Sequence, residues 1–282
     1  MTTDATDTAA VRSLKVPGAR LHYEVRGEGP LIVLVGAPMD AAAFAPLADL
    51  LATDHTVLTT DPRGINHSTL DDPEQDSTPE LRADDLFRLI THVDAGPAVL
   101  LGSSGGAVSA LALAQAHPDQ VSTVVAHEPP LIELLKDREQ LREGTEDLVA
   151  TYFAGDVTGA WRKFFAQADI AVPDPVLEQM FGGERDPRQV ADERRWFAHE
   201  MRASTYWQPD LAALRTAPTR IVVGIGDDSA GQLCDRTSRA LAQALGTEPT
   251  TFPGGHTGFV DTPEAFAARL RTVVGGPQRA KS

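Results

Sequence analysis

The residues of this chain best suited to chemistry lie in a short turn rich in glycine and serine. The segment Gly102-Ser103-Ser104-Gly105-Gly106 follows an apolar run and precedes a stretch of helix-forming residues, so we expect a strand, a sharp turn and a helix. In the spacing G-x-S-x-G, the glycines leave room for a strained turn that projects the hydroxyl of Ser104 above the sheet. Such a serine can attack a carbonyl group if a neighbouring base accepts its proton. The same five residues also suit an ordinary loop, so the rest of the chain must decide.

Length and charge limit what the protein can be. The 282 residues, of which 42% are hydrophobic and 23% charged, suit one large α/β domain with an insertion. A formal net charge of -15 would repel nucleic acid and anionic membrane surfaces. The single cysteine, Cys234, excludes an intrachain disulfide, and residues 1–8 lack the basic start and apolar core of a secretory signal. We expect a cytoplasmic monomer or homodimer that binds neither nucleic acid nor membrane.

Strand-like and helical stretches alternate along most of the chain, after residues 1–10, which we interpret as a disordered tail. An antiparallel hairpin is expected over 14–26 because polar and apolar residues alternate there. A continuous apolar run predicts a strand at 31–35 that is covered on both faces, and further strands are expected at 56–60, 98–102, 123–128, 219–225 and near 250–252. Helical patterns separate these strands. This alternation predicts a mostly parallel, doubly wound α/β sheet with helices on both faces.

Residues 131–209 interrupt the alternation. Strand-like runs are absent from this segment, and its helical stretches contain all three tryptophans. We expect a helical cap over 131–209, inserted after the sixth strand of a core formed by 11–130 and 210–282. The cap aromatics could cover an active site and line an apolar pocket, and Phe164 and Trp207 are the candidates for substrate contact. For most of the aromatics, a small core within the cap is the simpler interpretation.

Motifs with a common order and placement then identify a family. Each follows a predicted strand, and they lie at Gly36, 61–64, 102–106, 224–227 and 254–259. Parallel sheets bind their ligands at the carboxyl ends of strands, where all five motifs are placed. Outside the tail and the cap, the chain resembles a serine hydrolase of the α/β-hydrolase superfamily.

The resemblance implies a catalytic triad in the order serine, acid, histidine. It places Ser104 as nucleophile, Asp227 as acid and His256 as base. Histidine titrates near neutral pH, and a carboxylate on its far ring nitrogen fixes the tautomer and stabilises the imidazolium. Glu128 is the alternative acid, because some relatives place the acid after the sixth strand. Its other possible role is to hold the entry to the cap by hydrogen bonds.

The resemblance also implies an oxyanion hole made by backbone N–H groups. The donors would be Ala37, in the loop after the third strand, and Gly105, which follows the nucleophile. Many relatives carry His-Gly before the first of these residues, whereas this chain has Val35-Gly36. That difference removes a side chain and leaves the backbone donor unchanged.

The resemblance thus predicts a serine hydrolase that needs no cofactor. Its substrate would be an ester or lactone of a small, largely apolar molecule, cleaved through an acyl-enzyme on Ser104. A serine in place of an aspartate argues against dehalogenase and epoxide chemistry. The histidines and the cysteine lack the spacing of a zinc site, so we expect no metal. Two alternatives stay open: a carbon-carbon hydrolase or lyase that uses the same triad, and a non-catalytic member of the fold that binds small molecules.

Overall fold

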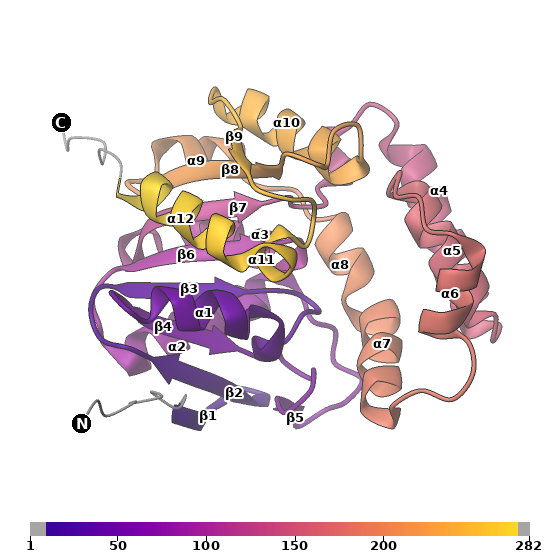
Figure 1. The fold of residues 1–282 in the computed structure, drawn as a ribbon, viewed down its shortest axis with the longest axis horizontal. Coiled ribbons are helices and arrows are strands. Elements are labelled where there is room, and N and C mark those ends of the chain that lie inside the picture. Colours follow the sequence, from indigo (N-terminus) through magenta and orange to yellow (C-terminus); the bar gives the residue numbers. More distant parts are fainter. Residues whose placement is uncertain (1–9, 276–282) are drawn as a thin grey trace.

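The computed structural model describes residues 10–275, and Figure 1 shows their arrangement as a sheet flanked by helices with a second group of helices at one end. The tail expected over 1–10 lies outside the described residues except for Ala10, which begins the first strand. Among the described residues, no helix has the length and apolar character needed to cross a bilayer.

The described strands form a single nine-stranded sheet. Its order is β1-β2-β4-β3-β6-β7-β8-β9, and the short β5 pairs with β2. The contacts of β2 are antiparallel, whereas the path from β4 to β9 is parallel throughout. The strands are β1 (Ala10–Val16), β2 (Ala19–Arg26), β3 (Leu31–Val35), β4 (Thr56–Thr60), β5 (Thr69–Leu70), β6 (Ala98–Ser103), β7 (Val121–His127), β8 (Arg220–Gly226) and β9 (Thr250–Phe252). The predicted α/β fold with an edge hairpin is confirmed.

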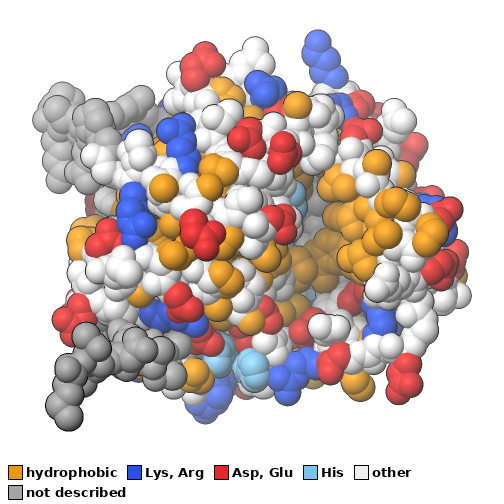
Figure 2. Space-filling model, in the orientation of Figure 1, with side chains coloured by type: hydrophobic (Ala, Val, Ile, Leu, Met, Phe, Trp, Pro, Cys, Tyr) orange, Lys and Arg blue, Asp and Glu red, His pale blue; other side chains and the backbone are white. Residues whose placement is uncertain are grey.

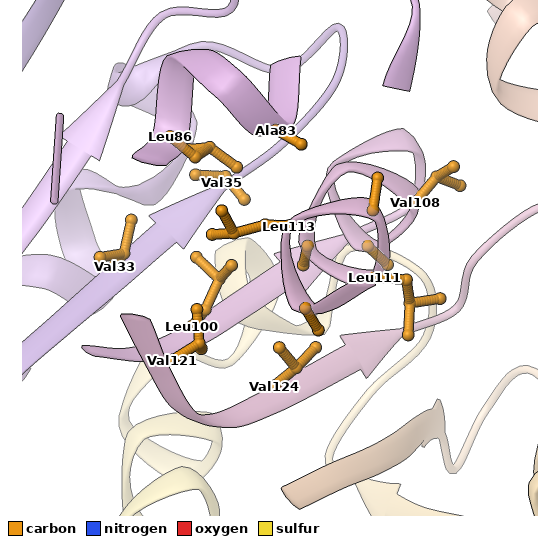
Figure 3. Close-up of a cluster of buried hydrophobic side chains, with 14 of the residues drawn as sticks. Val33, Val35, Ala83, Leu86, Leu100, Val108, Leu111, Leu113, Val121 and Val124 are labelled. Carbon is orange, nitrogen blue, oxygen red and sulfur yellow. The ribbon is translucent and has the colours of Figure 1, made fainter. Parts of the chain in front are cut away.

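Helices cover both faces of this sheet because its central strands are apolar on both sides. Along β3, Val33 and Val35 pack into one core cluster while Ile32 and Leu34 pack into another. The first cluster lies under α2 and α3 (Figure 3), and the second lies under α1 and α12. The core helices are α1 (Ala45–Leu51), α2 (Pro79–Val93), α3 (Gly105–Ala116), α9 (Leu211–Thr216), α10 (Leu233–Leu245), α11 (Gly258–Asp261) and α12 (Pro263–Val274), with short 3-10 turns η1 (Ala41–Phe44), η2 (Pro118–Gln120) and η3 (Ile132–Leu134).

Five helices between β7 and β8 form the cap. They are α4 (Arg138–Phe153), α5 (Val157–Gln167), α6 (Asp174–Phe181), α7 (Pro187–His199) and α8 (Met201–Thr205). They stand beside the carboxyl ends of the parallel strands (Figure 1). Since β7 is the sixth strand along the sheet, the insertion point agrees with the sequence-based expectation. The cap has its own aromatic core, in which Trp161 stacks on Phe181 and Trp196 while Tyr152 stacks on Phe197.

Polar contacts attach the cap to a loop of the core that follows β4. Arg195 of α7 is 9% exposed and donates to the carbonyl oxygens of Pro73 and Gln75, each at 2.9 Å. It packs so closely on Gly64 that a Cβ at that position would overlap the guanidinium. Nearby, Arg188 of α7 donates to Asn66 Oδ1 at 3.1 Å. The loop is therefore shaped to receive the cap.

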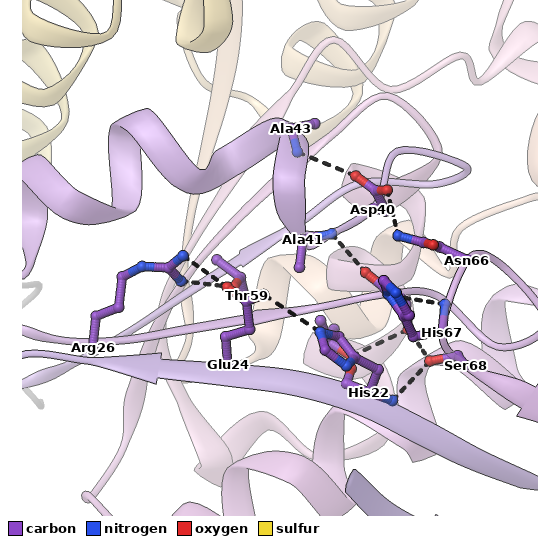
Figure 4. Close-up of polar contacts among 12 residues, drawn as sticks. His22, Glu24, Arg26, Asp40, Ala41, Ala43, Thr59, Asn66, His67 and Ser68 are labelled. Carbon is purple, nitrogen blue, oxygen red and sulfur yellow. Dashed lines mark hydrogen bonds and ion pairs between the residues drawn. The ribbon is translucent and has the colours of Figure 1, made fainter. Parts of the chain in front are cut away.

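The same loop is held from the core side by carboxylates (Figure 4). Asp61 accepts hydrogen bonds from the backbone N–H of Ala41 and of His67, at 2.9 and 3.0 Å. Asp40 accepts from Asn66 Nδ2 at 2.8 Å. The bonds to Asp61 satisfy two backbone donors, and the bond to Asp40 satisfies the side-chain amide of Asn66.

Candidate active site

Ser104 lies at the apex of the turn between β6 and α3. Its backbone adopts φ 56° and ψ -125°, a conformation that non-glycine residues rarely take. Two hydrogen bonds hold it there: the N–H of Ser104 donates to the carbonyl oxygen of His127 at 2.9 Å, and its own carbonyl oxygen accepts from Ala107 at 3.0 Å. Strain of this kind gathers at functional sites, where the surrounding structure maintains it.

The two glycines of the motif are required by close packing around this turn. A Cβ on Gly102 would overlap the carbonyl oxygen of Gly106, and a Cβ on Gly106 would overlap the carbonyl oxygen of Val35. Helix α3 can therefore begin directly against β3 and β6 only because both positions lack a side chain. The predicted strand, sharp turn and helix are present.

Ser103, the neighbouring serine, has a different environment. It is fully buried, and its Oγ lies 3.0 Å from Nδ1 of His127. The ring of His127 packs edge-on against Phe252 and Phe266. Burial lowers the pKa of His127 to about 4, so this imidazole is neutral at physiological pH. Ser103 and His127 therefore pack inside the core next to the turn, whereas Ser104 lines the cavity.

Glu128 follows β7 directly, as Ser104 follows β6. Because Ser103 of β6 pairs in register with His127 of β7, Ser104 and Glu128 are the first residues beyond two neighbouring strands. Glu128 also has a positive φ, 52°, and is fully buried. Its Oε1 accepts from the N–H of Gly226 at 2.8 Å, and its Oε2 lies 2.6 Å from Nδ1 of His256.

This contact determines the state of the histidine. An ionised Glu128 can only accept, so Nδ1 of His256 carries the proton and Nε2 is left free to act as a base. Burial raises the pKa of Glu128. The hydrogen bond from His256 and the charge of that residue outweigh burial and lower the pKa to about 2. Glu128 is therefore a carboxylate at neutral pH.

The expectation that Asp227 contacts His256 is wrong in this structure. Asp227 is exposed, and its Oδ1 accepts from the backbone N–H of Gly254 at 2.7 Å. Its own N–H donates to the carbonyl oxygen of Phe252 at 2.9 Å. Both bonds direct Asp227 along the exit of β9 and away from the imidazole. The sequence offered both carboxylates, and the contact of Glu128 with Nδ1 of His256 distinguishes them.

The pKa of His256 results from opposing effects. Burial lowers it, while the Cys234 sulfur and the Glu128 carboxylate raise it, giving a net upward shift to about 10. Both neighbours therefore favour the protonated imidazole.

The backbone groups expected to bind an oxyanion lie together. Ala37, Ser104 and Gly105 line the same cavity. Gly105 approaches Ala37 so closely that a Cβ on Gly105 would come within 2.6 Å of the Ala37 carbonyl oxygen. The loop after β3 and the start of α3 are thus side by side at the nucleophile.

The cavity has a volume of about 330 Å³ and lies between the strand ends and the cap. Figure 2 shows the hollow, with hydrophobic side chains gathered on its cap side. Apolar side chains dominate the lining: Pro130, Ile132, Leu148, Phe164, Phe165, Ile170, Trp196, Met201 and Leu233. Polar lining groups are Thr145, Gln167, Ser204, Thr205, Gln232, Cys234, His256 and Thr257. The described lining contains no Lys, Arg, Asp or Glu.

Of the two predicted cap contacts, the structure places one in the cavity. Phe164 lines it. Trp207 instead packs into the core cluster of α2 and α3, and its Nε1 donates to Glu80 at 2.8 Å. The expectation for Trp207 is therefore wrong, because this residue lies after α8, where the chain returns to the core. Trp196 and Phe165 line the cavity without having been singled out, since the sequence shows an aromatic-rich cap but not which helix faces turn inward.

Two groups of side chains have donor atoms close enough to be compared with metal sites. The first is His22, Asp61 and His67, and the second is Glu128, Cys234 and His256. In each group the potential ligand atoms lie within 4.8 Å of one another. The members are far apart in the sequence, so motif spacing could not have found either group.

Comparison with known proteins agrees with this geometry. The model of the alpha/beta hydrolase family matches residues 31–269. An uncharacterized hydrolase of Bacillus subtilis (strain 168), YraK, is 32% identical over 269 residues, which are 93% of this chain and 95% of that protein. The chain therefore belongs to the alpha/beta hydrolase family.

Two further relatives carry a substrate in their names. The 2-(acetamidomethylene)succinate hydrolase of Mesorhizobium japonicum (strain LMG 29417 / CECT 9101 / MAFF 303099) is 34% identical over 123 residues, 43% of this chain and 44% of that protein. The crystal structure of an E-2-(acetamidomethylene)succinate hydrolase aligns with a TM-score of 0.65 and 22% identity, covering 95% of this chain and 100% of that chain. The structural likeness extends to the whole fold, cap included.

Proposed function

We propose that this protein is a serine hydrolase that cleaves an ester or lactone of a small, neutral, largely apolar molecule. The observation that carries the proposal is the meeting of Ser104 and His256 in one apolar cavity, with the Glu128 carboxylate 2.6 Å from Nδ1 of His256. These are the groups that acyl transfer needs. Ser104 and Glu128 directly follow β6 and β7, and His256 lies in the loop between β9 and α11.

The reaction follows from the positions of these groups. Nε2 of His256 accepts the proton of Ser104 while the oxygen attacks the substrate carbonyl, and Glu128 stabilises the imidazolium that forms. The backbone N–H groups of Ala37 and Gly105 donate to the developing oxyanion. His256 then protonates the leaving alkoxide, which leaves an acyl group on Ser104. Water, deprotonated by the same imidazole, releases the acid and restores the serine.

The substrate class follows from the cavity lining. Its volume of about 330 Å³ suits a small molecule, and its surface is apolar apart from hydroxyl, amide, thiol and imidazole groups. The relatives named for 2-(acetamidomethylene)succinate act on a dicarboxylate. Because no described lining residue is a Lys or Arg, burying two carboxylates here would leave them without a charged partner. We therefore favour neutral esters and lactones.

A substrate panel tests this proposal. Neutral esters and lactones of graded acyl length are compared with matched substrates that carry a free carboxylate, beside a Ser104→Ala control. We expect turnover of the neutral set that falls by about 10⁴-fold in Ser104→Ala, and a fluorophosphonate adduct located on Ser104 by mass spectrometry. An adduct on Ser103, or none, would refute the nucleophile.

Two results of the panel would favour the alternatives. Preference for carboxylated substrates would contradict the substrate class. Substrate binding without turnover of any ester or lactone would point to a non-catalytic binding protein or to carbon-carbon bond cleavage.

A further inference from the structure

Cys234, the chain's single cysteine, lies in the same cavity as the groups proposed to perform catalysis. Its sulfur, a ring nitrogen of His256 and a carboxylate oxygen of Glu128 lie within 4.8 Å of one another. We propose that these three side chains form a site for a thiophilic divalent cation such as Zn²⁺, and that the bound ion inhibits the enzyme. The binding stands on the cluster alone, whereas the inhibition rests on the proposed function.

The donor set suits zinc. Thiolate, imidazole and carboxylate are its three common protein ligands, and three of them leave one position for water in a tetrahedral site. Softer thiolate ligands disfavour Mg²⁺ and Ca²⁺, which prefer oxygen. The two strong ligands, Cys234 and His256, both face the cavity, whose volume of about 330 Å³ gives the ion and its water access.

The three side chains are held in place by surrounding bonds. Glu128 is fixed by the N–H of Gly226, at 2.8 Å. Cys234 follows Leu233, whose N–H donates to the carbonyl oxygen of Ala168 in the cap at 3.0 Å. Three residues further on, Thr237 Oγ1 donates to the Pro129 carbonyl oxygen at 2.7 Å, next to Glu128. Binding would thus need little rearrangement of the chain.

Inhibition follows from the electron pair that the metal uses. Coordination through Nε2 occupies the base itself. Coordination through Nδ1 replaces the contact with Glu128 and leaves the ring proton on Nε2. In both cases Nε2 cannot accept the proton of Ser104, so the nucleophile is no longer activated. Binding also displaces the thiol proton of Cys234 to solvent, because the thiolate is the ligand. The second group of donors, His22, Asp61 and His67, is the natural rival for the ion. That group offers no thiolate, the ligand that a thiophilic ion prefers, and both oxygens of Asp61 accept backbone N–H groups.

Metal titration of the metal-free full-length protein tests the site without using activity. Co²⁺ serves as the spectroscopic probe, because its bond to a thiolate gives a charge-transfer absorption in the near ultraviolet. We expect this band in the wild type and in His67→Ala, and its loss in both Cys234→Ala and Cys234→Ser. In calorimetric titrations with Zn²⁺, the cysteine variants should show one binding event fewer than the wild type and His67→Ala. Absence of the band from the wild type, or its persistence in a cysteine variant, would overturn the proposal.

Activity assays then test inhibition. Each variant's hydrolysis of an activated ester is measured with added Zn²⁺ relative to its own rate in chelator. We expect Zn²⁺ to lower the hydrolysis rate of the wild type and of His67→Ala reversibly, by at least about tenfold. The rates of the cysteine variants should not change. If the cobalt band is present but no ester is cleaved, the metal site holds and the proposed function fails. If the band is present and Zn²⁺ leaves hydrolysis unchanged, the inhibitory role is wrong.

Discussion

The two walls of the cavity are built in different ways. On the core side, Ser104 and Glu128 follow paired strands, and the positive φ angles of both residues are fixed by backbone hydrogen bonds. On the cap side, aromatic and aliphatic side chains of α4, α5, α7 and α8 supply the surface, and the cap is attached through contacts such as those of Arg195. Backbone geometry tolerates little change, whereas side-chain packing tolerates substitution. We infer that the core determines the reaction and the cap determines the substrate.

The largest expected effect is on the core wall. Ser104→Ala should lower turnover by about 10⁴-fold or more, because the nucleophile is removed while binding groups remain. Ser103→Ala is the matched control. It should keep the reaction and cost about 1–3 kcal/mol of unfolding free energy, since His127 loses a buried hydrogen-bond partner. Single-turnover kinetics and denaturant unfolding measure the two effects. Equal loss of turnover in both variants would contradict the separation of roles.

The next largest loss of turnover is expected for Glu128, the carboxylate that contacts His256. Glu128→Gln should lower turnover by about 10³- to 10⁴-fold, because a neutral amide does not stabilise the imidazolium and its NH₂ can donate to Nδ1, which favours the wrong tautomer. Asp227→Asn should stay within about tenfold of the wild type, since Asp227 bonds Gly254 and is exposed. Both variants are compared on one activated ester at saturation. A crippled Asp227→Asn beside an active Glu128→Gln would restore the assignment that the sequence favoured.

The two carboxylates separate what could be predicted from the sequence from what could not. The alternation of strands and helices, the turn at Ser104 and the cap were predictable because apolar periodicity and glycine spacing are local signals. The choice between Glu128 and Asp227 was not, because it depends on how the exits of β8 and β9 bend. Trp207 was misplaced for a related reason: sequence gives the composition of the cap but not the point where the chain returns to the core. The cluster around Cys234 joins residues from three distant segments and had no local signal.

The pH profile offers a finer test of the core wall. The imidazole of His256 must be neutral to act as a base, so activity should rise with pH through the His256 pKa. The Glu128 carboxylate raises that pKa, so Glu128→Gln should move the ascending limb of kcat/KM to lower pH. Asp227→Asn should leave the limb in place. A shift to higher pH in Glu128→Gln would show that the carboxylate does not act on this histidine.

The smallest expected effects belong to the cap wall, and two aromatic residues separate lining from packing. Phe164 lines the cavity, so Phe164→Ala should change the ratio of kcat/KM between long and short acyl chains by about tenfold, with similar kcat on the best substrate. Trp207→Phe should leave that ratio unchanged, because Trp207 lies in the core. It should cost about 1–3 kcal/mol of unfolding free energy, since Glu80 loses the indole N–H. The acyl-length series and thermal unfolding are measured for both variants. If Trp207→Phe alters selectivity while Phe164→Ala only lowers stability, the cap wall is assigned to the wrong helices, and substrate choice would have to be sought in the core.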